Sequence, residues 1–350
     1  MEAIIPTHTL PDLPDASNPV QLSENLTRVT LPTPEPKPDE VRIRIEAFAV
    51  NPADVLQSKG LYDPPAGASE ILGLECAGIV DAVGTDLPNT YPWIVEGAAV
   101  CALVDGGAYA DYVCVPATQV LPLPQANENE EYTTAMGLVE SAATSWMVLE
   151  TVGKLHCATA TQTVLIHGAS GGVGSIAVQL AAAWGHTVYA TAGTPQRCRK
   201  VEELGAKQCF DYHDDWASQL KDQHPHGADL ILDVIGAAGL ESNVKALARR
   251  GTICIIGMLK GAKGELHIGR LMVKNGTLTT RTLRSQPREK KAEICAALRE
   301  HVWPLVANGT ITPAIGKTLP VSLLVQAHEL IAARDNRIFG KITIDTTERR

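Results

Sequence analysis

The sequence predicts a two-domain α/β protein in which a small β-barrel-like domain is joined to a doubly wound parallel sheet. Three observations lead to this prediction. The chain has 350 residues, which is long for one domain and sufficient for two. Short strand-like runs with glycine turns at close spacing continue to about residue 125. From residue 163 onward, apolar strands alternate with helices, as in a parallel sheet.

Composition narrows the class of protein. Hydrophobic residues make up 45% of the chain and charged residues 20%, so the protein buries a substantial core. A net charge of −9 argues against general binding to nucleic acid or to anionic membranes. No apolar run reaches the roughly 18 residues that span a bilayer, and the first residues lack the features of a signal peptide. The eight scattered cysteines form no C-x-x-C pair, so we expect a cytoplasmic protein without disulfides.

The first domain is expected to consist mainly of strands. Residues 1–40 carry many prolines and are predicted to connect early strands instead of forming a helix. Residues 41–50 begin with alternating apolar and polar side chains and predict a strand, whereas residues 51–65 predict a short helix and a polar loop. Further strands are expected at residues 73–83 and 98–104, and residues 106–115 are predicted to be a turn that leads into another strand.

A polar run at residues 127–131 is predicted to be the linker to the second domain, which begins with a helix over residues 133–152. Strands are expected at residues 164–167, 187–191, 208–211, 230–235 and 252–256, and helices at residues 173–184, 195–204, 217–223 and 241–248. The last segment holds only a helix near residues 288–303 and a strand at residues 340–344, which cannot bury a core of their own. We therefore expect residues 1–125 and 286–350 to form the first domain and residues 126–285 the second.

The most informative stretch is TVLIHGASGGVGSIAVQL, which ends at Leu180. It predicts a buried strand, a glycine-rich turn and an apolar helix. Glycines let the backbone approach a pyrophosphate, and a helix N-terminus offers unpaired N–H groups, so this arrangement forms a phosphate cradle. The spacing is G-x-x-G-G-x-G instead of G-x-G-x-x-G, so the strand–turn–helix context carries the interpretation. The predicted cofactor contacts are Gly171, Gly172, Val173 and Gly174; the alternative is a turn that only joins packed elements.

The cofactor is predicted to be NADPH instead of NADH. Sites for NAD place an acidic residue at the tip of the second strand, but here the tip reads TAGTPQRCRK and contains no acid. Gly193 and Thr194 precede Arg197, Arg199 and Lys200, and a hydroxyl and guanidinium groups can pair with a 2′-phosphate that a carboxylate would repel. The alternative for Arg197 is a solvated helix face.

Three further residues are candidates for the cofactor pocket. Tyr212 follows the third strand and is placed either to cap the same pocket or to lie half-buried in a loop. Gly236 and Gly257 follow later strands, at the sheet edge where the backbone meets the cofactor.

A β-domain, a glycine-rich nucleotide domain and a C-terminal return together resemble the medium-chain dehydrogenase/reductase superfamily, which implies a GroES-like domain and a Rossmann domain. Zinc alcohol dehydrogenases of that superfamily use cysteine and histidine ligands. Here Asn51 stands where the first ligand cysteine usually sits, and Leu74 replaces the histidine before Glu75. The four closely spaced cysteines of the structural zinc lobe are absent, and zinc needs about four converging donors. We therefore expect no metal.

Within that superfamily the chain resembles the zinc-free NADPH:quinone oxidoreductases, especially the p53-inducible subgroup. The matching stretches span nearly the whole chain. They are NPADVLQSKGLYDPP (51–65), GASEILGLECAG (67–78), the glycine-rich stretch, LILDVIG (230–236), LRS (283–285) and GKI (340–342). The resemblance implies hydride transfer from NADPH to a quinone or another electrophilic carbonyl compound.

The resemblance also implies roles for single residues. Members of the family place the equivalents of Asn51 and Tyr62 beside the nicotinamide. Tyr62 would then hydrogen-bond the carbonyl oxygen of the acceptor, and Asn51 would orient the cofactor or substrate. Thr144 matches a residue beneath the nicotinamide, and Arg284 and Ser285 are expected at the cofactor or at the subunit boundary. The alternatives are that Tyr62 only packs on neighbouring prolines and that Asn51 only fixes a turn.

Two residues depart from the family pattern, and they bear on the fine specificity of the site and not on dinucleotide binding itself. Val139 stands where a proline is frequent, and Gly171 stands where close relatives carry a serine. Aromatic residues are few, so Tyr62, Tyr109 and Trp146 are the candidates for stacking on a quinone, although the apolar helix around Trp146 is more typical of a core.

The sequence leaves two other functions open. Reduction of an activated C=C bond, as in alkenal or enoyl reductases, uses the same hydride donor and a similar carbonyl-polarising group. A non-catalytic NADPH-binding protein is the second alternative. A homodimer or homotetramer is expected, because residues 266–283 supply apolar strand material at the edge of the nucleotide sheet and exposed edges favour pairing.

Overall fold

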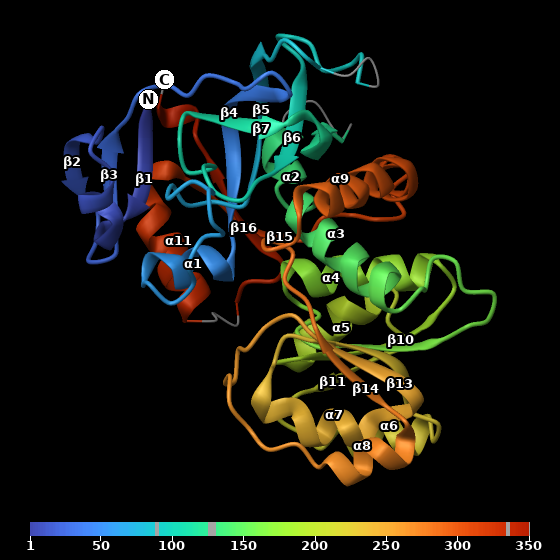
Figure 1. The fold of residues 1–350 in the computed structure, drawn as a ribbon. Coiled ribbons are helices and arrows are strands. Elements are labelled where there is room, and N and C mark those ends of the chain that lie inside the picture. The colour runs from blue at the N-terminus through green and yellow to red at the C-terminus, as the bar shows by residue number, and fades with distance from the viewer. Residues whose placement is uncertain (88–90, 125–130, 334–336, 350) are drawn as a thin grey trace. The chain divides into compact units, whose positions relative to one another are not determined.

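The computed structural model describes residues 1–87, 91–124, 131–333 and 337–349 (Figure 1). The chain divides into two compact units. The first unit comprises Met1–Glu140, Arg284–Ala307 and Ile315–Arg350, and the second unit comprises Ser141–Leu283 and Asn308–Ala314. Of the polar run predicted to be a linker, residues 127–130 lie outside the described residues.

The first unit contains two sheets. The smaller sheet is antiparallel and has the strand order β1-β3-β2. The larger sheet has seven strands in the order β15-β16-β4-β5-β6-β8, and β7 also pairs with β4. Buried side chains of both sheets, such as Ile4, Ile43 and Val100, share one hydrophobic core. The strands are β1 (Glu2–Pro6), β2 (Ser17–Gln21), β3 (Leu26–Thr30), β4 (Glu40–Val50), β5 (Glu75–Val83), β6 (Ala99–Leu103), β7 (Tyr112–Pro116), β8 (Val120–Pro122), β15 (Ile315–Pro320) and β16 (Lys341–Asp345).

The C-terminal strand β16 determines where the candidate site of the first unit forms. It runs antiparallel to β4 and pairs Ile342 with Val50, so the preceding Lys341 lies beside Asn51. Strand β5 pairs with the same end of β4, which brings its first residue, Glu75, to that end. The α-helices of this unit are α1 (Pro52–Ser58), α2 (Glu131–Ala135), α9 (Arg288–Ala297), α10 (Trp303–Ala307) and α11 (Leu324–Ala332).

The second unit has a six-stranded parallel sheet in the order β11-β10-β9-β12-β13-β14. This order, with helices between successive strands, confirms the predicted doubly wound fold. The strands are β9 (Thr163–Ile166), β10 (Thr187–Ala192), β11 (Gln208–Asp211), β12 (Ala228–Asp233), β13 (Leu247–Ile255) and β14 (Thr277–Thr280). The helices are α4 (Gly172–Ala183), α5 (Pro195–Glu203), α6 (Trp216–Gln223), α7 (Leu240–Ala246) and α8 (Ile268–Lys274), and α3 (Val139–Trp146) runs into this unit from the first.

Several predicted elements differ from the structure. The last segment, expected to hold one helix and one strand, also contains β15 and α11, and the helix expected over residues 241–248 ends where β13 begins. The helix expected over residues 133–152 is interrupted: α2 ends at Ala135, α3 begins at Val139, and a π-helical turn follows. Gly137 lies in the break, where its low helix propensity favours a turn. The stretch 266–283 is strand only at β14, because His267 caps α8 and Asn275 ends that helix in the left-handed region, at φ 49°. Among the described residues, every helix is too short or too polar to cross a membrane.

Candidate active site

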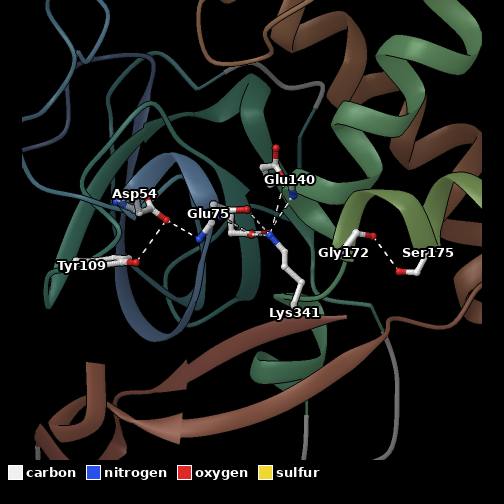
Figure 2. Close-up of polar contacts among 9 residues, drawn as sticks. Asp54, Glu75, Tyr109, Glu140, Gly172, Ser175 and Lys341 are labelled. Atoms are coloured by element: carbon white, nitrogen blue, oxygen red, sulfur yellow. Dashed lines mark hydrogen bonds and ion pairs between the residues drawn. The ribbon is translucent and has the colours of Figure 1, made fainter. Parts of the chain in front are cut away.

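A buried cation lies at the centre of a polar cluster in the first unit (Figure 2). The Nζ atom of Lys341 is 2.5 Å from Asn51 Oδ1 and 2.5 Å from Glu75 Oε1, and it lies 3.6 Å from Glu140 Oε2. Asn51 Nδ2 donates a further hydrogen bond to Glu75 Oε1 at 3.0 Å, and the backbone N–H of Glu140 donates to Glu75 Oε2 at 3.0 Å. Glu75 is fully buried and Lys341 is 5% exposed.

The carboxylates keep this lysine charged. Burial alone would lower the pKa of Lys341, but the negative charges of Glu75 and Glu140 outweigh burial and raise the pKa above its ordinary value. Both ends of the Asn51 amide are used within the cluster, its oxygen by Lys341 and its nitrogen by Glu75. Asn51 is therefore fixed in one orientation at the start of α1.

A second set of buried polar groups fixes the same helix. The carboxylate of Asp54 accepts hydrogen bonds from the backbone N–H groups of Asn51, at 2.7 Å, and Gly73, at 3.1 Å. The Tyr109 hydroxyl lies 3.4 Å from Asp54 Oδ2 and 3.2 Å from His328 Nε2. Burial raises the pKa of Asp54 to about 7 and lowers the pKa of His328 to about 4. Tyr109 is fully buried, so its prediction as a stacking partner for a quinone is wrong.

Tyr62 lies in the segment after α1, where the chain forms neither helix nor strand. Its side chain is half-buried, and its ring centroid is 5.6 Å from the guanidinium carbon of Arg284. Burial raises the pKa of Tyr62, and the charge of Arg284 opposes this increase. The neighbouring Ser285 is exposed. Trp146 is 6% exposed, as expected for a core residue.

In the second unit, the glycine-rich turn between β9 and α4 brings backbone atoms close together. A Cβ atom on Gly174 would lie 2.5 Å from the carbonyl oxygen of Gly168 and 2.7 Å from Cα of Ala169, so only glycine fits. Gly171 precedes α4 in extended conformation, so Gly172 and Val173 lie in the first helical turn, where backbone N–H groups have no acceptor within the helix. The turn is held from within by the Ser175 hydroxyl, which donates to the Gly172 carbonyl at 2.9 Å (Figure 2).

Helix α3 is tied to the same turn. The Ser145 hydroxyl donates a hydrogen bond to the carbonyl oxygen of Val173 at 3.0 Å. Thr144 directly precedes Ser145 and is 6% exposed. The residue that follows Thr144 is thus hydrogen-bonded to Val173, and Val139, at the start of α3, is fully buried.

The predicted 2′-phosphate residues lie beyond the end of β10. Thr194 caps α5 by accepting a hydrogen bond from the backbone N–H of Arg197 at 3.3 Å, and the Arg197 side chain is half-buried. A Cβ atom on Gly193 would lie 2.8 Å from the Tyr212 hydroxyl, so the tyrosine packs directly on this glycine. Gly236, with φ +79°, and Gly257 form turns after β12 and β13 at the same edge of the sheet.

Sequence reasoning missed Lys260 as part of this region. Its ammonium lies 4.6 Å from the ring centroid of Tyr212, and its backbone N–H donates to the carbonyl of Ile235 at 2.8 Å. The loop after β13 therefore returns toward β12 and carries a cation to the tyrosine that packs on Gly193. The sequence signal for Lys260 was limited to a polar, lysine-containing loop after a predicted strand.

Sequence reasoning also missed a series of buried hydrogen bonds near the ends of the sheet strands. His167 lies 2.8 Å from the Thr191 hydroxyl through Nδ1 and 2.7 Å from Asn243 Oδ1 through Nε2. Asn243 donates to Asp233 at 3.1 Å, and Asp233 accepts from the backbone N–H of Gly236 at 3.4 Å. Burial lowers the pKa of His167 to about 4, so the ring is neutral at pH 7. This series of hydrogen bonds links the tip of β10 to the Gly236 turn.

Comparison with known proteins shows where the chain belongs. One family model, the GroES-like domain of alcohol dehydrogenases, matches residues 37–125, and another, zinc-binding dehydrogenase, matches residues 172–298. The quinone oxidoreductase of Lama guanicoe is 30% identical over 310 residues, which cover 85% of this chain and 86% of that protein. The chain belongs to the zinc-free quinone oxidoreductase family. The Escherichia coli quinone oxidoreductase complexed with NADPH has a TM-score of 0.79 and 25% identity, and the match covers 99% of this chain and 100% of that chain.

A relative with another activity in its name is also similar. Prostaglandin reductase-3 of Mus musculus is 29% identical over 254 residues, which cover 72% of this chain and 64% of that protein.

The zinc ion of the wider superfamily does not fit the residues of this family member. Of the two positions that correspond to zinc ligands, Leu74 has an apolar side chain, and the Asn51 oxygen accepts from the Lys341 ammonium, which also pairs with Glu75. Among the described residues, no group of three or more His, Cys, Asp and Glu side chains is arranged to hold a metal ion. The site of this quinone oxidoreductase homologue is thus built around a lysine cation.

Proposed function

We propose that this protein is an NADPH-dependent quinone reductase that transfers a hydride to a quinone without a metal ion. The observation that carries the proposal is the Lys341 ammonium, which lies between Glu75 and Asn51, the residue at the expected first zinc-ligand position. Membership of the quinone oxidoreductase family supports the acceptor class. The complex of the similar E. coli protein with NADPH supports the cofactor.

The residues of the second unit fit NADPH. The N–H groups at the start of α4 would bind the pyrophosphate, and Gly174 leaves room for the backbone to approach it. Arg197, Thr194 and Lys260 would hold the 2′-phosphate, with Tyr212 packed beside them. The backbones at Gly193, Gly236 and Gly257 and the side chain of Thr144 complete the predicted contacts. When bound, NADPH supplies the hydride, which carries two electrons to the acceptor.

Tyr62 is the proposed hydrogen-bond donor to the acceptor. A quinone carbonyl oxygen gains negative charge as the hydride arrives, and a phenol that donates to it stabilises that charge. One further proton completes the hydroquinone, and the Tyr62 hydroxyl or water supplies it. Asn51 acts through its position at the start of α1, because both ends of its amide already have partners.

The competing reaction is reduction of an activated C=C bond. The similarity to prostaglandin reductase-3 favours it as the second candidate. The same hydride donor and the same tyrosine would serve, with the substrate carbonyl polarised by Tyr62 and the hydride delivered to the conjugated carbon. The two reactions differ in the acceptor alone.

The Tyr62→Phe variant tests the role of the phenol. Loss of the hydroxyl is expected to lower kcat for quinone reduction by about 10- to 100-fold and to leave the NADPH dissociation constant unchanged. Steady-state kinetics and a nicotinamide fluorescence titration measure the two quantities. Tyr112→Phe on strand β7 is the matched control and should retain full activity. An unchanged kcat in Tyr62→Phe would show that the assigned role is wrong.

The Arg197→Ala variant tests the 2′-phosphate site. We expect the dissociation constant of NADPH to rise about tenfold, which corresponds to about 1.4 kcal/mol, while that of NADH changes by less than about twofold. Fluorescence titration with each nucleotide gives the ratio. Arg199→Ala is the control, because Arg199 is exposed on the same helix. Equal weakening of both nucleotides by Arg197→Ala would contradict the assignment.

We also propose a cytoplasmic homodimer or homotetramer. Strand β14 is at the edge of the sheet, where its free side is open to pairing. The adjacent helix α8 exposes Ile268, Met272 and Val273, at 62%, 70% and 73% of their surface. An edge strand beside apolar exposed side chains is typical of a surface that a second copy covers.

A further inference from the structure

Arg284 is a buried cation that is fixed within the first unit. Arg284 is only 6% exposed. Nη1 donates to Gln57 Oε1 at 2.8 Å, and Nε and Nη2 donate to the backbone carbonyl of Asp105 at 2.8 and 2.6 Å. These bonds lie in the plane of the guanidinium group and run to neutral acceptors. None of these hydrogen bonds pairs the positive charge of Arg284 with a carboxylate. The bonds also leave the face of the guanidinium group available for contact with an aromatic ring.

Asp105, whose carbonyl accepts the bonds from Arg284, is itself held in place by neighbouring residues. Its carboxylate pairs with Lys291 of α9 at 2.5 Å. The next two residues, Gly106 and Gly107, have φ of +157° and +104°, and a Cβ atom on Gly106 would lie 2.6 Å from the carbonyl oxygen of Ser69. The loop at Asp105 thus has one conformation, and the guanidinium that it holds has one position.

The guanidinium group of Arg284 lies over the ring of Tyr62. The distance from the guanidinium carbon to the ring centroid is 5.6 Å, within the range of a cation–π contact. Tyr62 lies outside helices and strands, so side-chain contacts determine where its ring points. Gln57, which bonds to the same guanidinium, is on α1, five positions before Tyr62 in the sequence. Arg284 therefore joins the end of α1, the loop at Asp105 and the ring of Tyr62.

The charge of Arg284 also affects the phenol. A cation beside the ring favours the electron distribution of the phenolate, which makes the hydroxyl a stronger hydrogen-bond donor. Burial acts in the opposite direction and raises the pKa of Tyr62. Without Arg284, burial and the negative charges of Glu140 and Asp105, which all raise the pKa of Tyr62, would be unopposed.

We propose that Arg284 is a positioning residue for quinone reduction: it holds the Tyr62 ring against its guanidinium face and strengthens the phenol as a donor to the acceptor oxygen. The inference rests on the proposed role of Tyr62 in the reaction. It gives Arg284 a different role from the direct cofactor contact that the family resemblance implies.

A double-mutant cycle between Arg284→Gln and Tyr62→Phe tests the proposal. Arg284→Gln is expected to lower kcat about tenfold in the wild-type background and by less than about twofold in the Tyr62→Phe background, because the affected hydroxyl is already absent. Its NADPH dissociation constant should stay within about twofold of the wild-type value. Arg288→Gln, which removes an exposed cation from the start of α9, is the control and should leave kcat unchanged.

An ultraviolet titration gives a readout that does not depend on turnover. Subtracting the titration of a Tyr62→Phe protein from that of the same protein with Tyr62 isolates the ionisation of this tyrosine. In the Arg284→Gln background, the midpoint of that ionisation should move to higher pH. Arg284→Lys keeps the positive charge and replaces Arg284→Gln in these tests if the glutamine variant does not fold. Because lysine lacks the planar guanidinium group, this variant should also lower kcat. Equal losses of kcat in both backgrounds, an unmoved titration, or a large rise in the NADPH dissociation constant would overturn the proposal. If the wild type does not reduce quinones, the proposed function fails, while the titration still tests the contact.

Discussion

Replacing Lys341 with methionine is expected to lower the free energy of unfolding by about 3–5 kcal/mol, the usual effect of removing one partner from a buried ion pair. The substitution leaves the fully buried Glu75 without its cation and leaves Asn51 Oδ1 without its donor. Chemical denaturation at neutral pH measures the change. The folded-state pKa of Lys341 is raised, so its contribution in the wild type is fully present at neutral pH and is lost only as the pH rises through that raised value.

Two further variants show whether the buried charge is the cause. Adding Glu75→Gln to Lys341→Met removes the unpaired carboxylate and should recover part of the lost stability, as in other buried pairs that are neutralised together. Lys317→Met on the neighbouring strand β15 removes an exposed lysine and should change the free energy of unfolding by less than about 0.5 kcal/mol. If Lys341→Met unfolds at the same denaturant concentration as the wild type, the ammonium does not hold this cluster together.

The Gly174→Ala variant is expected to weaken NADPH binding by at least about 100-fold, or about 2.7 kcal/mol. The new methyl group would lie 2.5 Å from the Gly168 carbonyl oxygen and 2.7 Å from the Ala169 Cα. These are backbone atoms, so the turn itself must move, and the N–H groups that are proposed to bind the pyrophosphate would lose their common direction. Calorimetric or fluorescence titration with NADPH measures the loss.

Gly171→Ala provides the control within the same turn. Gly171 has a φ of −90°, which alanine adopts freely, and the nearest atom to its new Cβ is the Gly168 carbonyl oxygen at 3.4 Å. Binding of NADPH should therefore change by less than about twofold. Equal weakening in Gly171→Ala and Gly174→Ala would contradict the view that one close backbone approach shapes the cradle.

Local patterns were sufficient to predict much of the nucleotide sheet. Strand β11 and helix α4 were predicted to within a residue or two, because apolar runs and glycine turns are visible in short windows of sequence. The zinc-free character was also expected from Asn51 and Leu74 at the ligand positions. These features depend on residues that are close together in the chain.

The partners of the predicted residues could not be found in this way. Lys341 reaches Asn51 because β16 pairs with the end of β4, and nothing in the sequence near either residue specifies that register. Lys260 reaches Tyr212 through a loop that folds back toward β12. Tyr109 was misjudged because its burial depends on contacts with Asp54 and His328, which are far away in sequence.

Quinone reduction is tested by measuring NADPH consumption by the purified, chelator-treated protein, with a quinone in one cuvette and a 2-alkenal in the other. We expect rapid oxidation of NADPH with the quinone, insensitivity to chelator and a lower rate with NADH. Preference for the alkenal would contradict quinone reduction and assign double-bond reduction to the same cofactor site. Tight NADPH binding without turnover of either compound would contradict the catalytic account and leave a nucleotide-binding protein.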